Sequence, residues 1–482
     1  MGEKDSSSPP ELRPAQWVRE MQRRSAEELK DLLGIDDIQE LRDAVDKLHD
    51  ANILRTIRKE NRQKESANED ESDPWDKQHL EGYTYHFHYV GIIQYGQALL
   101  YVLPKYCNAV DSQTEVTTED MRWEPFKLVM QVIEQYEKSK RELGLEEDEQ
   151  LWEDSLHVMV ELVSDYVENG VYRDDEHVDE INGKGRILWQ RTIQKTLPFI
   201  QDDEPIYMEL HTRRKREDDQ NFFTRMHHYL AHQAWSALHM VRLDSLLSLP
   251  DIPAPEDSDS DFSEKEYMLD SIHAELSQQF DSRRRYLLQL MERFLDRKEE
   301  TFSNGFHTFG KTEFHTVWEE ACRVAFGMEK STTGMMEASK PHWQFVGAQN
   351  VFRGSALEAD MMKVDGRKLT ILDAKYYVPD SSKTEKEIVA AMPGIGDIIK
   401  QQLYELALRK TLTEDETKVK VANAFILPLR DDEKAVGEVT LGKVEIPMLT
   451  DLGLAPVELV KYPPQTIWGA YLDHVPINIP GM

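Results

Sequence analysis

One stretch, residues 351–377, restricts the fold of this chain more than any other. The Asp-Gly pair at 365–366 lies between two apolar runs, and in that position it is a strong signal for a tight turn between two strands. The second run opens with LTIL (369–372) and becomes charged at Asp373 and Lys375. Because side chains repeat every two residues along a strand, we expect these two charged groups on one face.

A carboxylate from the neighbouring strand, Asp360, would complete a group that suits phosphodiester chemistry. Two or three carboxylates hold a hard cation such as Mg²⁺ through oxygen. A lysine beside them can orient a water molecule or stabilise charge on the pentavalent phosphate. A bare Asp-x-Lys is more often a solvent-facing ion pair. The interpretation therefore depends on the hairpin, on the second acid and on the surrounding helices.

Two helices are predicted around the hairpin, and a buried strand after them. FHTVWEEACRVAFG (314–327) places Glu319 or Glu320 about one turn into the first helix. The second helix, within 393–410, has a polar row at spacings of three and four on one side: Lys400, Gln401 and Tyr404. VKVANAFILPL (419–429) supplies the strand. The predicted order is helix, strand, strand-turn-strand, helix, strand.

Length and composition indicate an α/β (α+β) protein of several domains. At 482 residues the chain is long enough for two to four of them. It contains no run of about eighteen apolar residues, so no transmembrane helix is predicted. Its first residues lack an apolar signal core, and Cys107 and Cys322 match no metal-ligand spacing. We therefore expect a reduced, cytoplasmic protein without membrane attachment.

Composition changes divide the chain into six predicted segments. Capping signals at Ser25 and Asp37 begin two short helices in the first of them. The segments are a small helical, winged-helix-like module (1–62), an acidic linker (63–79), a mixed α/β domain (80–249), a second acidic linker (250–264), an α/β domain with preceding helices that contains the hairpin (265–445), and a C-terminal extension (446–482).

A competing interpretation comes from GFHTFGKT (305–312), which satisfies the Walker A pattern. With LTILD (369–373) as a Walker B strand, the chain would be a P-loop nucleotide hydrolase. A P-loop must, however, follow a buried strand, and the sequence before this one is charged and helical in character. It also leaves Asp360 and Lys375 without a role.

The net charge of −32 limits how the chain can act on nucleic acid. Contacts to phosphate come from Lys and Arg, and the affinity for DNA depends on them. A chain this acidic is not expected to hold duplex DNA tightly by itself. Either its positive charge is concentrated in one patch or a partner delivers the DNA, and we favour the partner.

The segment resembles the PD-(D/E)xK nuclease superfamily, and more closely the LlaJI-type restriction endonucleases, relatives of the McrC subunit of modification-dependent restriction. The resemblance covers roughly residues 83–429. Its motifs are VWEEA (317–321), EAD (358–360), ILDAKYY (371–377) and GDIIKQQLY (396–404), with YVGII (89–93), VLPKY (102–106) and GRILWQRTI (185–193) upstream.

The resemblance implies a PD-(D/E)xK core of the order α-β-β-β-α-β in the domain at 265–445. It implies an endonuclease of a restriction or anti-phage defence system that cleaves double-stranded DNA with Mg²⁺, or with Mn²⁺ as a substitute. It also implies a partner, a hexameric McrB-like AAA+ NTPase that hydrolyses GTP or ATP. The domain at 80–249 would then be the arm that contacts this motor. A catalytically inactive adaptor that stimulates the motor is the remaining alternative.

By resemblance, each candidate site residue takes a role. Asp360, Asp373 and Glu319 would be metal ligands, and Lys375 the catalytic lysine. The polar positions of the second helix correspond to Gln401 and Tyr404. Many relatives have proline where this chain has Ala359, which leaves Glu358 as an alternative to Asp360. Glu320 likewise stays an alternative to Glu319.

Overall fold

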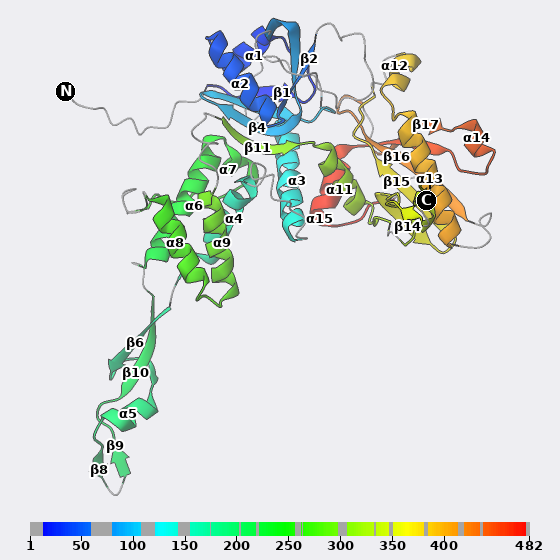
Figure 1. Cartoon of the computed structure of the whole chain (residues 1–482). Coiled ribbons are helices and arrows are strands. Elements are labelled where there is room, and N and C mark those ends of the chain that lie inside the picture. The colour runs from blue at the N-terminus through cyan, green and yellow to red at the C-terminus, as the bar shows by residue number, and fades with distance from the viewer. Residues whose placement is uncertain are drawn as a thin grey trace. The chain divides into compact units, whose positions relative to one another are not determined.

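A computed structural model of the chain confirms the mixed α/β class (Figure 1). It describes residues 13–58, 80–107, 121–142, 155–173, 175–201, 204–217, 221–255, 262, 264–296, 306–331, 334–346, 350–379, 384–412, 419–433 and 437–478. The linker predicted at 63–79 lies outside these ranges, as does part of the one at 250–264. The chain forms two units, one of residues 1–153 with 300–482 and one of residues 154–299.

The N-terminal part of the first unit is built on a four-stranded sheet in the order β1-β5-β4-β11. Strand β1 (Gln16–Arg19) runs parallel to β5 (Ala98–Leu103), and β4 (Tyr89–Tyr95) is antiparallel to both β5 and β11 (Phe306–Thr312). A second ribbon pairs β2 (Leu54–Arg58) with β3 (Tyr83–Phe87). The sheet thus joins N-terminal strands to β11, which lies about 200 residues further along the chain.

The two helices predicted near the N-terminus are confirmed. Helix α1 (Ala26–Leu33) has Ser25 and Glu28 in a reciprocal capping box, and α2 (Ile38–Asp50) is capped by Asp37. Both helices pack into one hydrophobic core with strands β3, β4 and β5. The segment 1–62 therefore shares its core with residues beyond 80.

The second sheet of this unit has the order β14-β15-β16-β18-β17. Its strands are β14 (Met361–Asp365), β15 (Lys368–Ala374), β16 (Lys420–Pro428), β17 (Val439–Val444) and β18 (Val457–Tyr462). The predicted hairpin is confirmed, because β14 and β15 are antiparallel and their turn contains Gly366 at φ 60°. Strands β15, β16 and β18 are parallel. The segment predicted as a C-terminal extension therefore supplies an internal strand, β18.

Helices α11 (His315–Ala325) and α13 (Ile395–Leu412) both contact β15. Helix α11 also packs against α15 (Pro464–Asp473) and α3 (Trp123–Glu142). At the contact with α15, the rings of Trp318 and Trp468 meet edge to face. Shorter helices are α12 (Glu385–Ala390) and α14 (Pro447–Thr450). The extra strand expected between α11 and the hairpin is represented, in the described residues, by β12 (His342–Trp343) and β13 (Phe352–Arg353), which pair with each other.

The Walker A match is part of a β-strand. Its described residues, 306–312, form β11 and pair with β4 along their whole length. Gly310 lies opposite Gly91, and a Cβ atom on Gly310 would stand 2.2 Å from the carbonyl oxygen of Val90. The glycine therefore permits two strands to approach closely. The P-loop interpretation is wrong, because a phosphate-binding loop must link a strand to a helix.

The second unit combines helices with a β-ribbon. Its helices are α4 (Ser155–Asn169), α6 (Phe222–Met240), α7 (Leu243–Leu247), α8 (Lys265–Leu276) and α9 (Ser282–Asp296). An ion pair of 2.8 Å between Arg283 and Asp165 joins α9 to α4. Helices α8 and α9, which sequence analysis assigned to the hairpin domain, thus belong to this unit.

The ribbon consists of β6 (Asp175–Ile181) and β10 (His211–Glu217), with β7 (Arg186–Ile187) on the other edge of β10. Between β7 and β10 lie α5 (Trp189–Lys195) and the hairpin of β8 (Phe199–Gln201) and β9 (Glu204–Ile206). In the described part of both units, no helix is long and apolar enough to cross a membrane.

Candidate active site

Strand β15 brings Asp373 and Lys375 to the face of the sheet that α13 covers. Leu369 and Ile371, which precede them on that face, pack with Tyr404 and other side chains of α13. The carboxyl of Asp373 is buried, with 5% of the residue exposed. Its Oδ2 atom lies 3.2 Å from Nζ of Lys375. The strand periodicity read from the sequence therefore places these two groups together.

Lys375 also contacts a residue that sequence analysis did not assign to the site. Its Nζ atom lies 3.3 Å from Oδ1 of Asp397, in the first turn of α13. Burial opposes a charge on Lys375, but Asp373 and Asp397 outweigh it and raise the pKa of its ammonium. The lysine is therefore held in its charged form between β15 and α13. The sequence signals for Asp397 were its place at the start of the predicted helix and its presence in the motif GDIIKQQLY (396–404).

Glu319 faces the same group from α11. Burial raises the pKa of its carboxyl to about 7, and the negative charges of Asp360 and Asp373 act in the same direction. Its neighbour Glu320 is instead held by Arg323, one turn along the helix, and those side chains form an ion pair. The structure thus favours Glu319 as the acid of α11 that faces the site.

Asp360 lies at the bend immediately before β14 and acts on both buried acids. Its charge contributes to the raised pKa of Glu319 and to that of Asp373. The adjoining Ala359 is fixed by Ser331, since Ala359 N–H donates to Ser331 Oγ at 2.8 Å and Ser331 N–H donates to Ala359 O at 3.0 Å. Proline has no N–H and could not form the first of these bonds. The departure Ala359 therefore has a local structural reason, and Glu358 is exposed.

The surroundings of Asp373 disfavour the charged form of its carboxyl. Burial raises the pKa of its carboxyl to about 6 against the opposing charge of Lys375, and Asp360 raises it further. Its Oδ1 atom is buried and has no hydrogen-bond partner among the residues that the structure describes. A buried carboxylate oxygen without a partner is costly unless a proton or a cation satisfies it.

The two polar positions of α13 differ in what they contact. Gln401 is fully buried, and its side-chain amide donates to Asn423 Oδ1 at 2.8 Å on β16. Its contacts thus join α13 to the sheet. Tyr404 is also buried, and burial raises the pKa of its phenol to about 12, with Asp373 and Asp360 adding to the shift. Tyr404 therefore lies in the electrostatic field of the acids of the site.

The donor set fits a hard divalent cation. Glu319, Asp360 and Asp373 offer carboxylate oxygens, which such ions prefer, and their mutual repulsion would be relieved by positive charge. Within the described residues no three acidic, His or Cys side chains form a ready metal-binding cluster. These three carboxylates could still hold Mg²⁺, because this ion keeps several waters and needs direct contact with only one or two of them.

Comparison with known proteins identifies the family of the chain. The family model "LlaJI restriction endonuclease" matches residues 89–457, which include every site residue named above. The chain belongs to the LlaJI restriction endonuclease family. A curated relative in Bacillus subtilis (strain 168), "Type II restriction enzyme BsuMI component YdjA", is 25% identical over 414 residues, or 80% of this chain and 81% of the relative. Membership of the LlaJI family makes this chain a nuclease of a restriction system.

Among solved structures, the chain is similar to one from the "Refined half-complex from tetradecameric assembly of Thermococcus gammatolerans McrB AAA+ hexamers with bound McrC". The identity is 12% and the TM-score 0.39, with 96% of this chain and all of that chain covered. A TM-score of this size indicates only a loose overall likeness.

Proposed function

We propose that the chain is the endonuclease subunit of a restriction and anti-phage defence system, cleaving phosphodiester bonds of double-stranded DNA at a PD-(D/E)xK site with Mg²⁺. One observation carries the proposal: Glu319, Asp360 and Asp373 come from three separate parts of the fold but interact beside Lys375. Asp360 and Asp373 raise the pKa of Glu319, and Asp360 also raises the pKa of Asp373. An ordinary surface ion pair would show neither this burial nor this convergence.

Glu319, Asp360 and Asp373 are the residues that would hold Mg²⁺, with Mn²⁺ as a substitute. The bound ion would supply Lewis-acid stabilisation of the phosphate. Lys375, kept charged by Asp373 and Asp397, directs its ammonium toward the negative charge that grows on the phosphate. The raised pKa of Glu319 reflects burial and repulsion from Asp360 and Asp373, and a bound cation would relieve that repulsion.

The acidic surface argues for a partner that delivers the DNA. The net charge is −32, whereas phosphate binding needs Lys and Arg. We propose a McrB-like AAA+ NTPase hexamer, hydrolysing GTP or ATP, in this role. The described ribbon of the second unit offers a contact surface, which we call the tip patch. It consists of exposed apolar side chains on α5, on β8 and next to them, namely Trp189, Ile193, Leu197, Phe199, Ile200 and Met208.

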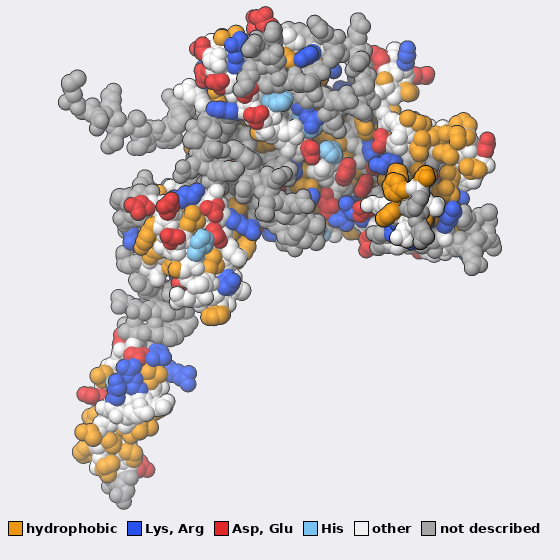
Figure 2. Space-filling view, in the orientation of Figure 1, with side chains coloured by type: hydrophobic (Ala, Val, Ile, Leu, Met, Phe, Trp, Pro, Cys, Tyr) orange, Lys and Arg blue, Asp and Glu red, His pale blue; other side chains and the backbone are white. Residues whose placement is uncertain are grey.

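Figure 2 shows hydrophobic side chains gathered over α5 and the β8–β9 hairpin. Exposed apolar patches of this kind mark protein interaction sites. The tip patch lies in the domain at 80–249, which the sequence interpretation assigned to the motor.

Plasmid cleavage in Mg²⁺ tests the proposal, with and without a McrB-like AAA+ protein. Lys375→Ala should stop cutting while the fold and partner binding persist, because the lysine acts on the transition state. Lys363→Ala is the matched control, since Lys363 is exposed on the adjoining strand β14. Cutting that survives Lys375→Ala would place the active site elsewhere. Absence of cutting by the wild type under all conditions, together with faster nucleotide hydrolysis by the partner, would favour the inactive-adaptor alternative.

A further inference from the structure

The residue after the catalytic lysine is tied to the N-terminal sheet. The phenol of Tyr376 donates a hydrogen bond of 2.8 Å to Oε2 of Glu20, the residue that follows β1. Both side chains are buried, although 356 positions separate them in sequence. We propose that Glu20 is a positioning residue for Lys375 and acts through Tyr376. This inference rests on the proposed function, because it assigns Lys375 its catalytic part.

Glu20 is itself held in place by the N-terminal sheet. Its backbone N–H donates to Leu103 O at 2.8 Å and so continues the pairing of β1 with β5. The backbone N–H of Lys105, just beyond β5, lies 3.2 Å from Glu20 Oε2 and 3.3 Å from the Tyr376 hydroxyl. The Lys105 ammonium stands 4.6 Å from the centre of the Tyr376 ring. The hydroxyl of Tyr376 is therefore fixed from two strands at once.

The ring of Tyr376 also reaches the helix that carries Glu319. It meets Phe314, which caps the start of α11, with 5.6 Å between ring centres. It also meets Tyr106, with 6.4 Å between ring centres. Tyr376 thus contacts the N-terminus of α11 and is the next residue after Lys375 in the chain. A shift of Tyr376 would move the ammonium of Lys375 relative to the acid of α11.

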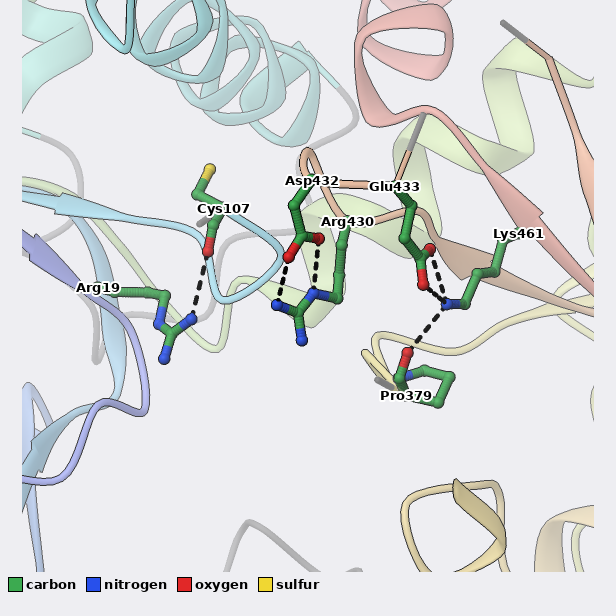
Figure 3. Close-up of polar contacts among 7 residues, drawn as sticks. All are labelled: Arg19, Cys107, Pro379, Arg430, Asp432, Glu433 and Lys461. Atoms are coloured by element: carbon green, nitrogen blue, oxygen red, sulfur yellow. Dashed lines mark hydrogen bonds and ion pairs between the residues drawn. The ribbon is translucent and has the colours of Figure 1, made fainter. Parts of the chain in front are cut away.

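A second anchor holds the chain as it leaves β15. Nζ of Lys461, a fully buried residue of β18, donates to Pro379 O at 2.9 Å and contacts both oxygens of Glu433 at 2.7 and 2.8 Å (Figure 3). Residues 376–379 are therefore attached at both ends, by Glu20 and by Lys461. Catalytic side chains must keep their geometry to within about 0.5 Å, and supporting hydrogen bonds of this kind provide that precision.

The hydroxyl of Tyr376 fixes the orientation of the side chain through its bond to Glu20, whereas the ring supplies the packing. The aromatic contacts of Tyr376 would survive its replacement by phenylalanine, whereas the bond to Glu20 would not. A hydrogen bond to a buried acid is directional, and its loss removes one of the contacts that hold the Glu20 carboxyl and the Tyr376 hydroxyl together. Tyr376→Phe therefore separates positioning from ring packing.

We would measure kcat and KM for DNA cleavage by the full chain with its AAA+ partner. Tyr376→Phe and Glu20→Leu should each lower kcat about tenfold with KM unchanged, because small misplacements slow the chemical step. The double variant should be no slower than either single one, since both remove the same bond. Glu20→Gln keeps an acceptor oxygen and should restore most of kcat. Tyr462→Phe is the matched control, because its buried hydroxyl on β18 has no hydrogen-bond partner in the described part of the chain.

A second readout needs neither metal nor DNA. The backbone N–H of Lys375 donates to Ile426 O at 2.8 Å, and this amide should exchange with deuterium faster in Tyr376→Phe than in the wild type. Wild-type kcat and exchange in Tyr376→Phe would overturn the inference, as would additive losses in the double variant. If Lys375→Ala stops cutting while Tyr376→Phe cuts normally, only this inference fails. If Lys375→Ala still cuts, the proposed function fails as well.

Discussion

The ammonium of Lys375 lies 3.3 Å from Oδ1 of Asp397 and so joins the end of β15 to the first turn of α13. The same ammonium lies 3.2 Å from Asp373. Two acids thus share one lysine, so Asp397 would still hold it if Asp373 bound a cation. Helix α13 is therefore part of the site as well as a cover for the sheet.

The first prediction concerns this pair. Asp397→Asn removes one of the two charges that fix Lys375, so kcat for DNA cleavage should fall about tenfold. The Mg²⁺ concentration for half-maximal cutting should stay the same, because Asp397 is not a proposed ligand. Steady-state cleavage across a Mg²⁺ titration measures both quantities. Asp365→Asn, in the exposed hairpin turn, serves as the control. A wild-type kcat in Asp397→Asn would show that Asp373 alone positions the lysine.

A matched pair on α11 distinguishes its two acids. Glu319→Gln should reduce cleavage at least a hundredfold, because Glu319 is the acid of α11 that interacts with Asp360 and Asp373 and is proposed to hold the metal with them. Glu320→Gln should cleave at the wild-type rate and lose only its ion pair with Arg323, which is worth about 1 kcal/mol or less at a partly exposed site. Cleavage rates and thermal unfolding of both variants test this. The opposite ranking would assign the metal to Glu320.

The acids of the site should also make stability depend on pH. In the metal-free protein the pKa of Glu319 is raised to about 7 and that of Asp373 to about 6, whereas both titrate at about 4 when unfolded. Between those values the folded state binds more protons, so these groups lower the free energy of unfolding as pH rises. Mg²⁺ should therefore raise Tm more at pH 8 than at pH 6, because it competes with those protons.

Thermal unfolding with and without Mg²⁺ at the two pH values measures this difference. Asp373→Asn should lose most of the Mg²⁺ effect and should be more stable than the wild type at pH 8 without metal. An equal Mg²⁺ effect at both pH values would contradict the assignment of these carboxyls.

The tip patch gives a prediction about the partner. Leu197→Asp combined with Phe199→Asp places charges on side chains that are 93% and 62% exposed, so folding should be unaffected. Stimulation of nucleotide hydrolysis by the AAA+ partner should fall about tenfold or more, since an apolar contact would then have to bury charge. Phe280→Asp is the control, because Phe280 is 92% exposed in the same unit but outside the tip patch. Equal stimulation by all variants would exclude the tip patch as the contact.

The close pairing of β11 with β4 at Gly310 predicts that a substitution there affects stability and not catalysis. Gly310→Ala should destabilise the protein by about 1–3 kcal/mol, because the new methyl group would meet Val90 O and Gly91. Gly469→Ala, in α15 with open space around it, should be neutral or slightly stabilising. Denaturant unfolding compares the two. No loss of stability in Gly310→Ala would mean that the strands can separate at little cost.

The local features of the site could be predicted from the sequence because they depend on residues close in the chain. The Asp-Gly turn fixed the hairpin, and the two-residue period placed Asp373 beside Lys375. Capping residues marked α1 and α2. The P-loop match failed for the opposite reason, since a short pattern does not reveal that Gly310 pairs with Gly91.

The sequence by itself determined which side chains share a strand face and where several of the helices begin. Only the tertiary structure decided which acid of α11 meets the site, that Asp397 joins it, and that Glu20 reaches Tyr376 across 356 positions. It also placed β18 inside the second sheet. Periodicity is a property of neighbouring residues, whereas these choices depend on how distant segments pack, and packing is set by the whole core at once.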